Sequence, residues 1–208
     1  MLIIRELEKK DTSMISSLAL LHEAAFPSFF LTQLGIPFLR TLYNGYLEDL
    51  DSGIIVAEED NAIVGFIAYS NDYPKFYKSL VKHHIVKFAL CSLKAAIRHP
   101  SYIKRLFGAL KKSESVVKNE KYVELASICV EPTNNKRGIG SALIDYLKRI
   151  VDFDEYAYIN LETDAVDNDS VNRFYKNNGF HLVRVFTTSE GRIMNEYRFK
   201  GDNSKYAY

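Results

Sequence analysis

The pattern of hydrophobic and polar positions predicts a mixed order of strands and helices in the first seventy residues. Residues 2–7 have the composition of a short strand, and apolar residues then recur at helical spacing through 14–26 and 37–50. Two runs rich in β-branched residues, 53–59 and 62–70, follow as predicted strands. This part of the chain therefore predicts the order β, α, α, β, β.

Short polar stretches indicate where these elements begin and end. Asp60 and Asn61 separate the two predicted strands, and both residue types tolerate the left-handed backbone of a tight hairpin turn. Asp11, Thr12 and Ser13 precede the first helix and carry side chains that could cap its free amide groups. We therefore expect a hairpin between the strands and a side-chain cap on the helix.

The second half of the chain begins with an insert, residues 73–121, that holds two helical patterns at 74–97 and 101–112. Pro100 separates them because a proline disfavours helical backbone at the preceding residue. The later predicted elements are a strand at 122–130, a helix at 141–151, a strand at 156–165, a helix at 167–177, and hairpin strands at 180–188 and 192–200. Together the patterns predict one mixed α/β domain over residues 1–208, built on a single sheet.

The composition is that of a folded protein, with 47% hydrophobic and 25% charged residues. No apolar run reaches the roughly 18 residues of a membrane span, and the N-terminus lacks the pattern of a signal peptide, so we expect a cytoplasmic protein. Cys91 and Cys129 lie in apolar segments without metal-ligand spacing. They are expected to be reduced structural thiols, and no metal is expected.

The net charge of +1 hides a strong asymmetry. The insert holds twelve Lys and Arg against two acidic residues, so it carries +10 and the rest of the chain −9. Such a segment could face an anionic substrate or an anionic membrane surface, or form the solvated side of helices that pack on the sheet or on a second subunit. Its aromatic residues fall at core-like spacing without an evident stacking surface, so nucleic acid is not expected.

Two glycines one residue apart, Gly138 and Gly140, stand where the helix at 141–151 begins. A helix N-terminus leaves about four backbone amides without intrahelical partners and carries partial positive charge. Glycines let an anion approach such amides closely, and Lys136 and Arg137 add attraction. Leu143 replaces the third glycine of a dinucleotide-binding fingerprint. A phosphate site and a glycine turn used only for packing are the two interpretations.

A second motif favours the phosphate site. Residues 168–180 read NDSVNRFYKNNGF, and with the strand, Val-x-Pro, basic Gly-x-Gly loop and helix of residues 122–151 they resemble the GNAT superfamily of acyl-CoA-dependent N-acetyltransferases. The two motifs occur in the family's order, and the resemblance covers residues 122–181. The chain departs from the family pattern at Asn135 and Lys136, where Gln or Arg and then Gly are usual, and at Val171, where a small residue is usual.

The resemblance implies the order β-α-α-β-β-[helical insert]-β-α-β-α-β-β, with splayed central parallel strands that bind acetyl-CoA. Backbone groups of Ile128 and Val130 would pair with the pantetheine arm, and Asn168 would hydrogen-bond the arm or the neighbouring strand. Tyr175 would lie near the sulfur atom. The residues implied to hold the pyrophosphate are Lys136, Arg137, Gly138, Ile139, Gly140 and Ser141.

Acyl transfer to an amine needs a base for the amine and a proton donor for the departing thiolate. Tyr175 suits the second role, because a phenol with a pKa of about 10 is protonated at neutral pH, whereas a thiol has a pKa of about 8.5. Glu124, on the strand implied to bind the coenzyme, is the candidate base, and Glu162 on the neighbouring strand is an alternative. His22 and Glu23 are further candidates if the loop after the first helix lines the acceptor site.

The predicted function is transfer of an acetyl group from acetyl-CoA to a primary amine of a small-molecule acceptor, by direct attack in a ternary complex. A non-catalytic acyl-CoA sensor or interaction module of the same fold is the alternative. Basic residues of the insert motivate an anionic acceptor such as a nucleotide-linked amino sugar, or peripheral contact with anionic lipid. The acceptor, and the choice between monomer and homodimer, are left open. An unchanged KM for the acceptor after charge reversal would count against the anionic acceptor, and the residues to reverse are Lys104, Arg105, Lys111 and Lys112.

Overall fold

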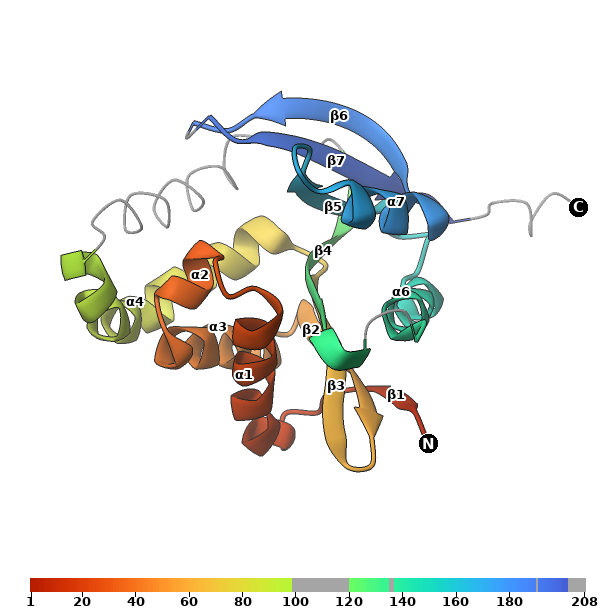
Figure 1. Ribbon diagram of the computed structural model, residues 1–208. Coiled ribbons are helices and arrows are strands. Elements are labelled where there is room, and N and C mark those ends of the chain that lie inside the picture. Colours follow the sequence, from red (N-terminus) through yellow and green to blue (C-terminus); the bar gives the residue numbers. More distant parts are fainter. Residues whose placement is uncertain (99–119, 135–136, 190, 202–208) are drawn as a thin grey trace, which may run out of the picture.

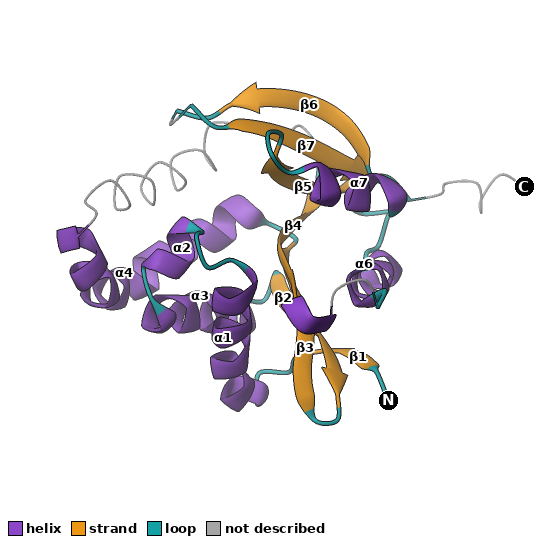
Figure 2. Ribbon diagram, viewed as in Figure 1, coloured by secondary structure: helices purple, strands orange, loops and turns teal. Residues whose placement is uncertain are grey.

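The computed structural model describes residues 1–98, 120–134, 137–189 and 191–201, with the backbone alone for 92–98. Its centre is a sheet in the order β1-β2-β3-β4-β5-β7-β6, antiparallel throughout except between β4 and β5. β4 lies between the β1–β3 half and the β5–β7 half (Figure 2). The strands are β1 (Ile3–Glu6), β2 (Ser52–Glu59), β3 (Ala62–Ser70), β4 (Tyr122–Val130), β5 (Tyr158–Asp164), β6 (His181–Thr187) and β7 (Ile193–Phe199). This arrangement confirms the predicted mixed α/β fold.

Helices cover both faces of the sheet. Helices α1 to α4 lie on one face, and α6 and α7 on the other (Figure 1). The helices are α1 (Ile15–Ala25), α2 (Phe30–Gln33), α3 (Ile36–Glu48), α4 (Tyr73–Arg98), α6 (Ile139–Ile150) and α7 (Asp169–Asn177), with 3-10 turns η1 (Asp11–Met14) and η2 (Pro132–Asn134). The helix predicted at 101–112 falls outside the described residues. Within the described part, no helix combines the length and apolar character needed to cross a bilayer.

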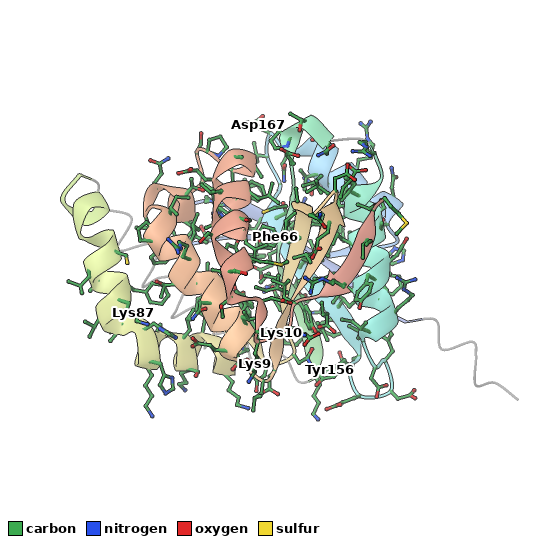
Figure 3. All side chains as sticks on the ribbon, turned by 90° about the horizontal axis from the view of Figure 1, so that it is seen from below. Lys9, Lys10, Phe66, Lys87, Tyr156 and Asp167 are labelled. Carbon is green, nitrogen blue, oxygen red and sulfur yellow. The ribbon has the colours of Figure 1, made fainter. Side chains whose placement is uncertain are left out.

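Alternate residues of the central strands build two hydrophobic cores. Ile54 and Val56 of β2 face α1, α3 and α4, which we name the first core, whereas Ile55 and Ala57 face α6 in the second core. All four side chains are fully buried, as expected for a strand covered on both faces. Phe66, labelled in Figure 3, belongs to the first core between the sheet and the helices.

The first helix of the insert, α4, is part of the first core. Its Phe76 ring lies 4.1 Å from the ring of Tyr46 on α3, and its Phe88 ring lies 4.7 Å from that of Phe38 (centroid distances). Gly45 of α3 faces Leu80 and lets that side chain pack closely against the helix backbone. The described part of the insert therefore packs mainly on another helix, α3.

Local turns agree with the sequence at one position and differ at another. Asp60 and Asn61 have φ of 51° and 64°, so the predicted hairpin between β2 and β3 is confirmed. The predicted cap of α1 is wrong, because residues 11–14 form η1 and α1 begins at Ile15 without a side-chain cap. The Asp11 carboxylate accepts hydrogen bonds from the Glu8 amide (3.0 Å) and from Arg5 of β1 (2.8 Å) instead.

A buried polar pair joins α1 to α3 inside the first core. His22 Nδ1 lies 2.6 Å from the Tyr43 hydroxyl, and the His22 side chain is 2% exposed. Its Nε2 has no hydrogen-bond partner among the described residues. Burial lowers the pKa of His22 to about 4, so the imidazole is neutral at physiological pH.

Phe76→Ala should lower the free energy of unfolding by about 3–5 kcal/mol, because it opens a cavity in the first core. Leu90→Ala on the same helix should change it by less than about 0.5 kcal/mol, because that side chain is 69% exposed. Urea unfolding of both variants checks this. If both variants lose the same free energy of unfolding, Phe76 is not packed in the first core as described above.

His22 should make the protein sensitive to acid. Its pKa is lower in the folded chain (about 4) than the ordinary value of 6.5, so the unfolded chain binds the proton first. Stability should therefore fall as the pH drops below about 6.5, by about 3 kcal/mol at pH 4 from this group. The free energy of unfolding in urea should be measured at about pH 6.5 and at pH 4. His22→Gln should remove this loss of stability, whereas the exposed His181→Gln should keep it. An unchanged pH dependence in His22→Gln would contradict the assignment.

Candidate active site

The two central parallel strands separate soon after they begin to pair. β4 and β5 pair from Tyr122 opposite Tyr158 to Glu124 opposite Asn160. Beyond Glu124, β4 remains paired with β3 as far as Val130, while β5 turns away. The predicted splay is confirmed, and the rest of this edge of β4, which we name the open edge, does not pair with β5.

Backbone groups of Ile128 and Val130 point to the open edge. The amide of the next residue, Glu131, donates to the Val64 carbonyl at 2.9 Å and so faces β3. Successive residues of a strand direct their backbone groups to opposite edges, so Val130 and Ile128 face away from β3. These are the two residues that the resemblance implied for the pantetheine arm.

The N-terminus of α6 lies beyond the end of β4 and leaves amides without intrahelical partners. Its first backbone bond runs from the Ala142 amide to the Gly138 carbonyl at 3.0 Å, so the amides of Ile139, Gly140 and Ser141 lie ahead of the ladder. No described side chain caps them. Together with the helix dipole they form a site suited to an anion. Lys136, which was implied for the same site, falls outside the described residues.

The two glycines that begin α6 serve different purposes. Gly138 has a left-handed φ of 79°, and a Cβ placed there would meet no described atom within 4 Å. A Cβ on Gly140 would lie 3.0 Å from the Phe174 ring and 3.7 Å from Val130 Cγ2. Gly138 therefore provides the turn and an open approach, while Gly140 lets α6 pack closely against α7 and β4.

The Arg137 side chain is bound to other side chains of the protein, so anion binding is not its only role. Its guanidinium makes two hydrogen bonds to the Glu59 carboxylate, at 2.7 and 2.8 Å, and one to Asn134 Oδ1 at 2.7 Å. The ion pair lowers the pKa of Glu59 and ties the loop before α6 to the β2–β3 hairpin. The Arg137 side chain therefore fixes the position of the loop.

Glu124 lies where the open edge begins and is 9% exposed. Asn160 Nδ2 donates to its Oε2 at 2.7 Å across the last β4–β5 pair. Burial first, and then the charge of Glu124, raises the pKa of Tyr122. The same carboxylate also contributes to the raised pKa values of tyrosines on α3 and α4, which are Tyr46, Tyr73 and Tyr77.

A β-bulge determines which β4 side chains share a face with Glu124. Leu125 and Ser127 pair with the adjacent β3 residues Tyr69 and Ala68, so Ala126 is the extra residue. Residues three apart on a regular strand would lie on opposite faces. Because of the bulge, Glu124 and Ser127 both face the helices of the first core, where Ser127 lies beside the hydroxyl of Tyr43.

Tyr175 lies on the other face, in the second core. It is 6% exposed and packs beside the rings of Phe180 and Tyr197, at 5.9 and 6.0 Å between centroids. Burial, followed by the nearby Cys129 thiol, raises its pKa. The two candidate catalytic residues therefore occupy opposite faces of the sheet.

Asn168 is bound to the end of β5. Its Nδ2 donates to Thr163 Oγ1 at 2.8 Å and to the Asp164 carbonyl at 3.1 Å. The neighbouring Asn172 donates to the same carbonyl, and its Oδ1 accepts bonds from Asn195 and the Tyr197 hydroxyl. These bonds fix α7 against β5 and β7. Of the two partners expected for Asn168, the structure provides the strand.

The alternative bases occupy different places. Glu162 lies on β5 two residues after Asn160, Glu23 is exposed on α1, and His22 is buried against Tyr43. A histidine with a pKa of about 4 is a weak proton acceptor at neutral pH. The described residues contain no group of three or more His, Cys, Asp and Glu placed to hold a metal ion.

Sequence reasoning missed the partners of the candidate residues. Asn160 follows no motif, and only its register with Glu124 makes it a partner of the candidate base. The hydrogen bond between Tyr43 and His22 joins two helices, and no sequence pattern indicates that these helices pack together. Tyr73 and Tyr77 were detectable as an i, i+4 pair on one helix face, but nothing in the sequence indicates which surface that face covers.

Comparisons with known proteins agree with this geometry. A family model described as the acetyltransferase (GNAT) family matches residues 17–180. The search of curated proteins gave no significant match. Among solved structures, the fold resembles a Desulfovibrio desulfuricans protein assigned to the GNAT family of acetyltransferases, with a TM-score of 0.62, 16% identity, and coverage of 96% of this chain and 99% of that one.

Two other solved structures differ in what they act on or bind. A protein from Bacillus anthracis assigned as a streptothricin acetyltransferase, in complex with acetyl coenzyme A, has a TM-score of 0.51 and 17% identity, and covers 77% of this chain and 70% of its own. The polyamine N-acetyltransferase of Drosophila melanogaster, which forms N-acetylagmatine, has a TM-score of 0.57 and 12% identity, with coverage of 97% and 100%. At these identities the likeness shows the fold, whereas the family model spans most of the sequence. The chain therefore belongs to the GNAT family of acetyltransferases.

Proposed function

We propose that this acetyltransferase moves an acetyl group from acetyl-CoA to a primary amine of a small-molecule acceptor, by direct attack in a ternary complex. The observation that carries the proposal is the open edge of β4. It has the uncapped N-terminal amides of α6 beyond one end and the buried Glu124 at the other. A long thioester with an anionic end matches both features.

The coenzyme would lie along the open edge. The pyrophosphate would accept hydrogen bonds from the amides of residues 137–141, with Lys136 beside them. The pantetheine amides would pair with Ile128 and Val130 as an added strand, and an amide in this region would stabilise the oxyanion of the tetrahedral intermediate. Asn168 would keep α7 and β5 in place through its bonds to Thr163 and Asp164.

The acceptor amine would approach from the face of the first core, where Glu124 lies. Asn160 orients that carboxylate, and its Oδ1 is buried without a hydrogen-bond partner among the described residues. An unpaired buried acceptor is costly, and an amine N–H or a water molecule would satisfy it. The carboxylate and this oxygen together suit a primary amine.

In the reaction, the amine nitrogen attacks the thioester carbonyl carbon while Glu124 takes a proton from it, directly or through water. The new C–N bond forms, the C–S bond breaks, and the thiolate of coenzyme A leaves. Since burial raises the pKa of Tyr175 further above that of a thiol, complete proton transfer from the phenol is uphill. Tyr175 would therefore donate a hydrogen bond to the sulfur as negative charge develops.

A covalent acetyl-cysteine intermediate is not part of this proposal. Cys129 is 1% exposed, and burial raises the pKa of its thiol. A buried neutral thiol is a poor nucleophile. Intersecting initial-velocity lines with both substrates varied are therefore expected, whereas parallel lines would favour a covalent route.

The hypothesis of an anionic acceptor was motivated by the charge of the whole insert, and the residues whose charge reversal would test it, at positions 104, 105, 111 and 112, lie outside the described part. The described surroundings of Glu124 are phenols and an amide, which suit an amine without indicating a phosphorylated one. An acceptor screen by mass spectrometry should therefore include amino sugars, nucleotide-linked amino sugars, polyamines, amino acids and peptide N-termini.

Gly138→Ala should weaken binding of acetyl-CoA about tenfold, because the new Cβ enters the space through which the pyrophosphate approaches. Gly191→Ala is a matched control, since that residue has a similar φ of 83° and open surroundings in the β6–β7 turn. Both variants should lose about 1–2 kcal/mol of stability from the left-handed backbone. Isothermal titration with acetyl-CoA separates the effects, and equal affinity in both variants would contradict the proposed cradle.

Glu124→Gln should lower kcat/KM for the amine by about 100-fold, because it removes the base while keeping the shape of the side chain. Glu23→Gln tests the exposed alternative base on α1, and we expect this variant to keep full activity. Thiol release from acetyl-CoA in the presence of pooled amines measures both variants. If Glu162→Gln shows the larger loss, the base is on β5. Tight acetyl-CoA binding without turnover in the wild-type protein would instead favour a sensor.

A further inference from the structure

The outward face of α4 carries large apolar side chains that the described structure leaves exposed. Ile85, Val86 and Leu90 are 49%, 67% and 69% exposed. At 3.6 residues per turn, Val86 and Leu90 lie opposite Phe88, which packs into the first core, and Ile85 lies between the two sides. The second half of α4 is thus apolar on both sides, although only one side is needed for the fold.

The same helix is basic and has no acidic residue. Its sequence from Tyr73 to Arg98 contains six Lys and Arg and no Asp or Glu. Lys82 is exposed one helical turn before Val86. Lys87, labelled in Figure 3, lies instead on the side of α4 that faces α3, where it lines a pocket with Arg40 and Asn44. Six more Lys and Arg follow at positions 99–121 of the sequence, against two Glu.

We propose that this outer face of α4, made of Lys82, Ile85, Val86 and Leu90, binds an anionic lipid surface. Apolar side chains flanked by lysines are the composition of helices that lie in a membrane interface, with the apolar groups among the acyl chains and the lysines at the headgroups. Each lysine near an anionic surface adds an attraction that is screened by salt. The binding is peripheral, along the helix.

Charge distinguishes this partner from two other ways of covering the face. A second copy of the chain in a two-fold dimer would place two α4 helices against each other, each with basic residues and no acidic ones. Residues 99–119 of the chain are themselves basic, with Lys104 and Arg105 among them. Both arrangements bring like charges together, whereas anionic lipid neutralises them. The inference does not depend on the acceptor or on the catalytic roles proposed above.

The test is sedimentation of the full-length protein with vesicles at low salt. Vesicles of phosphatidylcholine mixed with phosphatidylglycerol should bind the protein, and vesicles of phosphatidylcholine alone should bind it at least tenfold more weakly. Lys82→Gln should reduce binding to the anionic vesicles by about fivefold, from roughly 1 kcal/mol for one lysine. Physiological salt should weaken binding of the wild-type protein.

Val86→Asp with Leu90→Asp should reduce binding at least tenfold, because both side chains lose their place among the acyl chains. Leu20→Asp with Val185→Asp is the matched control, since these residues are 56% and 54% exposed on α1 and β6. The control should bind like the wild type. Unchanged thermal unfolding of each variant shows that it is folded.

Three results would overturn the proposal. In the first, the wild-type protein does not bind anionic vesicles but forms a dimer, and Val86→Asp with Leu90→Asp dissociates that dimer. The face is then covered by a second copy of the chain. In the second, the protein is a monomer that does not bind vesicles, and the same double variant destabilises it. The face is then covered by another part of the same chain. Vesicle binding that the α4 variants leave intact would place the lipid contact elsewhere.

Discussion

The divergence of β4 and β5 after Glu124 is the constraint on which the rest of the site depends. A parallel pair normally continues until one strand ends, because each unpaired backbone group in a sheet interior must find another partner. Here β4 remains anchored to β3, and β5 is held by β7, so the gap between them is maintained from both sides. The side-chain bonds of Asn168 and Asn172 then fix α7 where β5 ends. The open edge is therefore a rigid feature of the fold.

Two further features orient chemistry around this edge. The bulge at Ala126 turns Ser127 to the same face as Glu124, which directs polar side chains to the side covered by α1, α3 and α4. The opposite side holds Tyr175 and the start of α6. In the tetrahedral intermediate of the proposed direct transfer, the amine nitrogen and the departing sulfur are two different substituents of one carbon. A base beside the nitrogen and a hydrogen-bond donor beside the sulfur can therefore come from different faces of the sheet.

The insert contributes to the core and presents a surface. Phe76 joins it to α3, while Leu90 and its neighbours remain outside. One apolar face is enough for a helix to pack on the core, so folding alone does not require a second, exposed apolar face beside a lysine. The presence of both a buried and an exposed apolar face on α4 is the physical reason to expect that the insert also binds a partner.

The sequence by itself determined the order of elements, the β2–β3 hairpin and the helix end left open at Gly138, because each depends on local backbone preferences and short-range periodicity. It also indicated the family, since both motifs lie within continuous segments. Only the tertiary structure decided that Arg137 pairs with Glu59, that Asn160 supports Glu124, and that α1 begins without its expected cap. Those facts are contacts between elements, and their register and packing are set by the whole sheet and its two cores, which no local pattern contains.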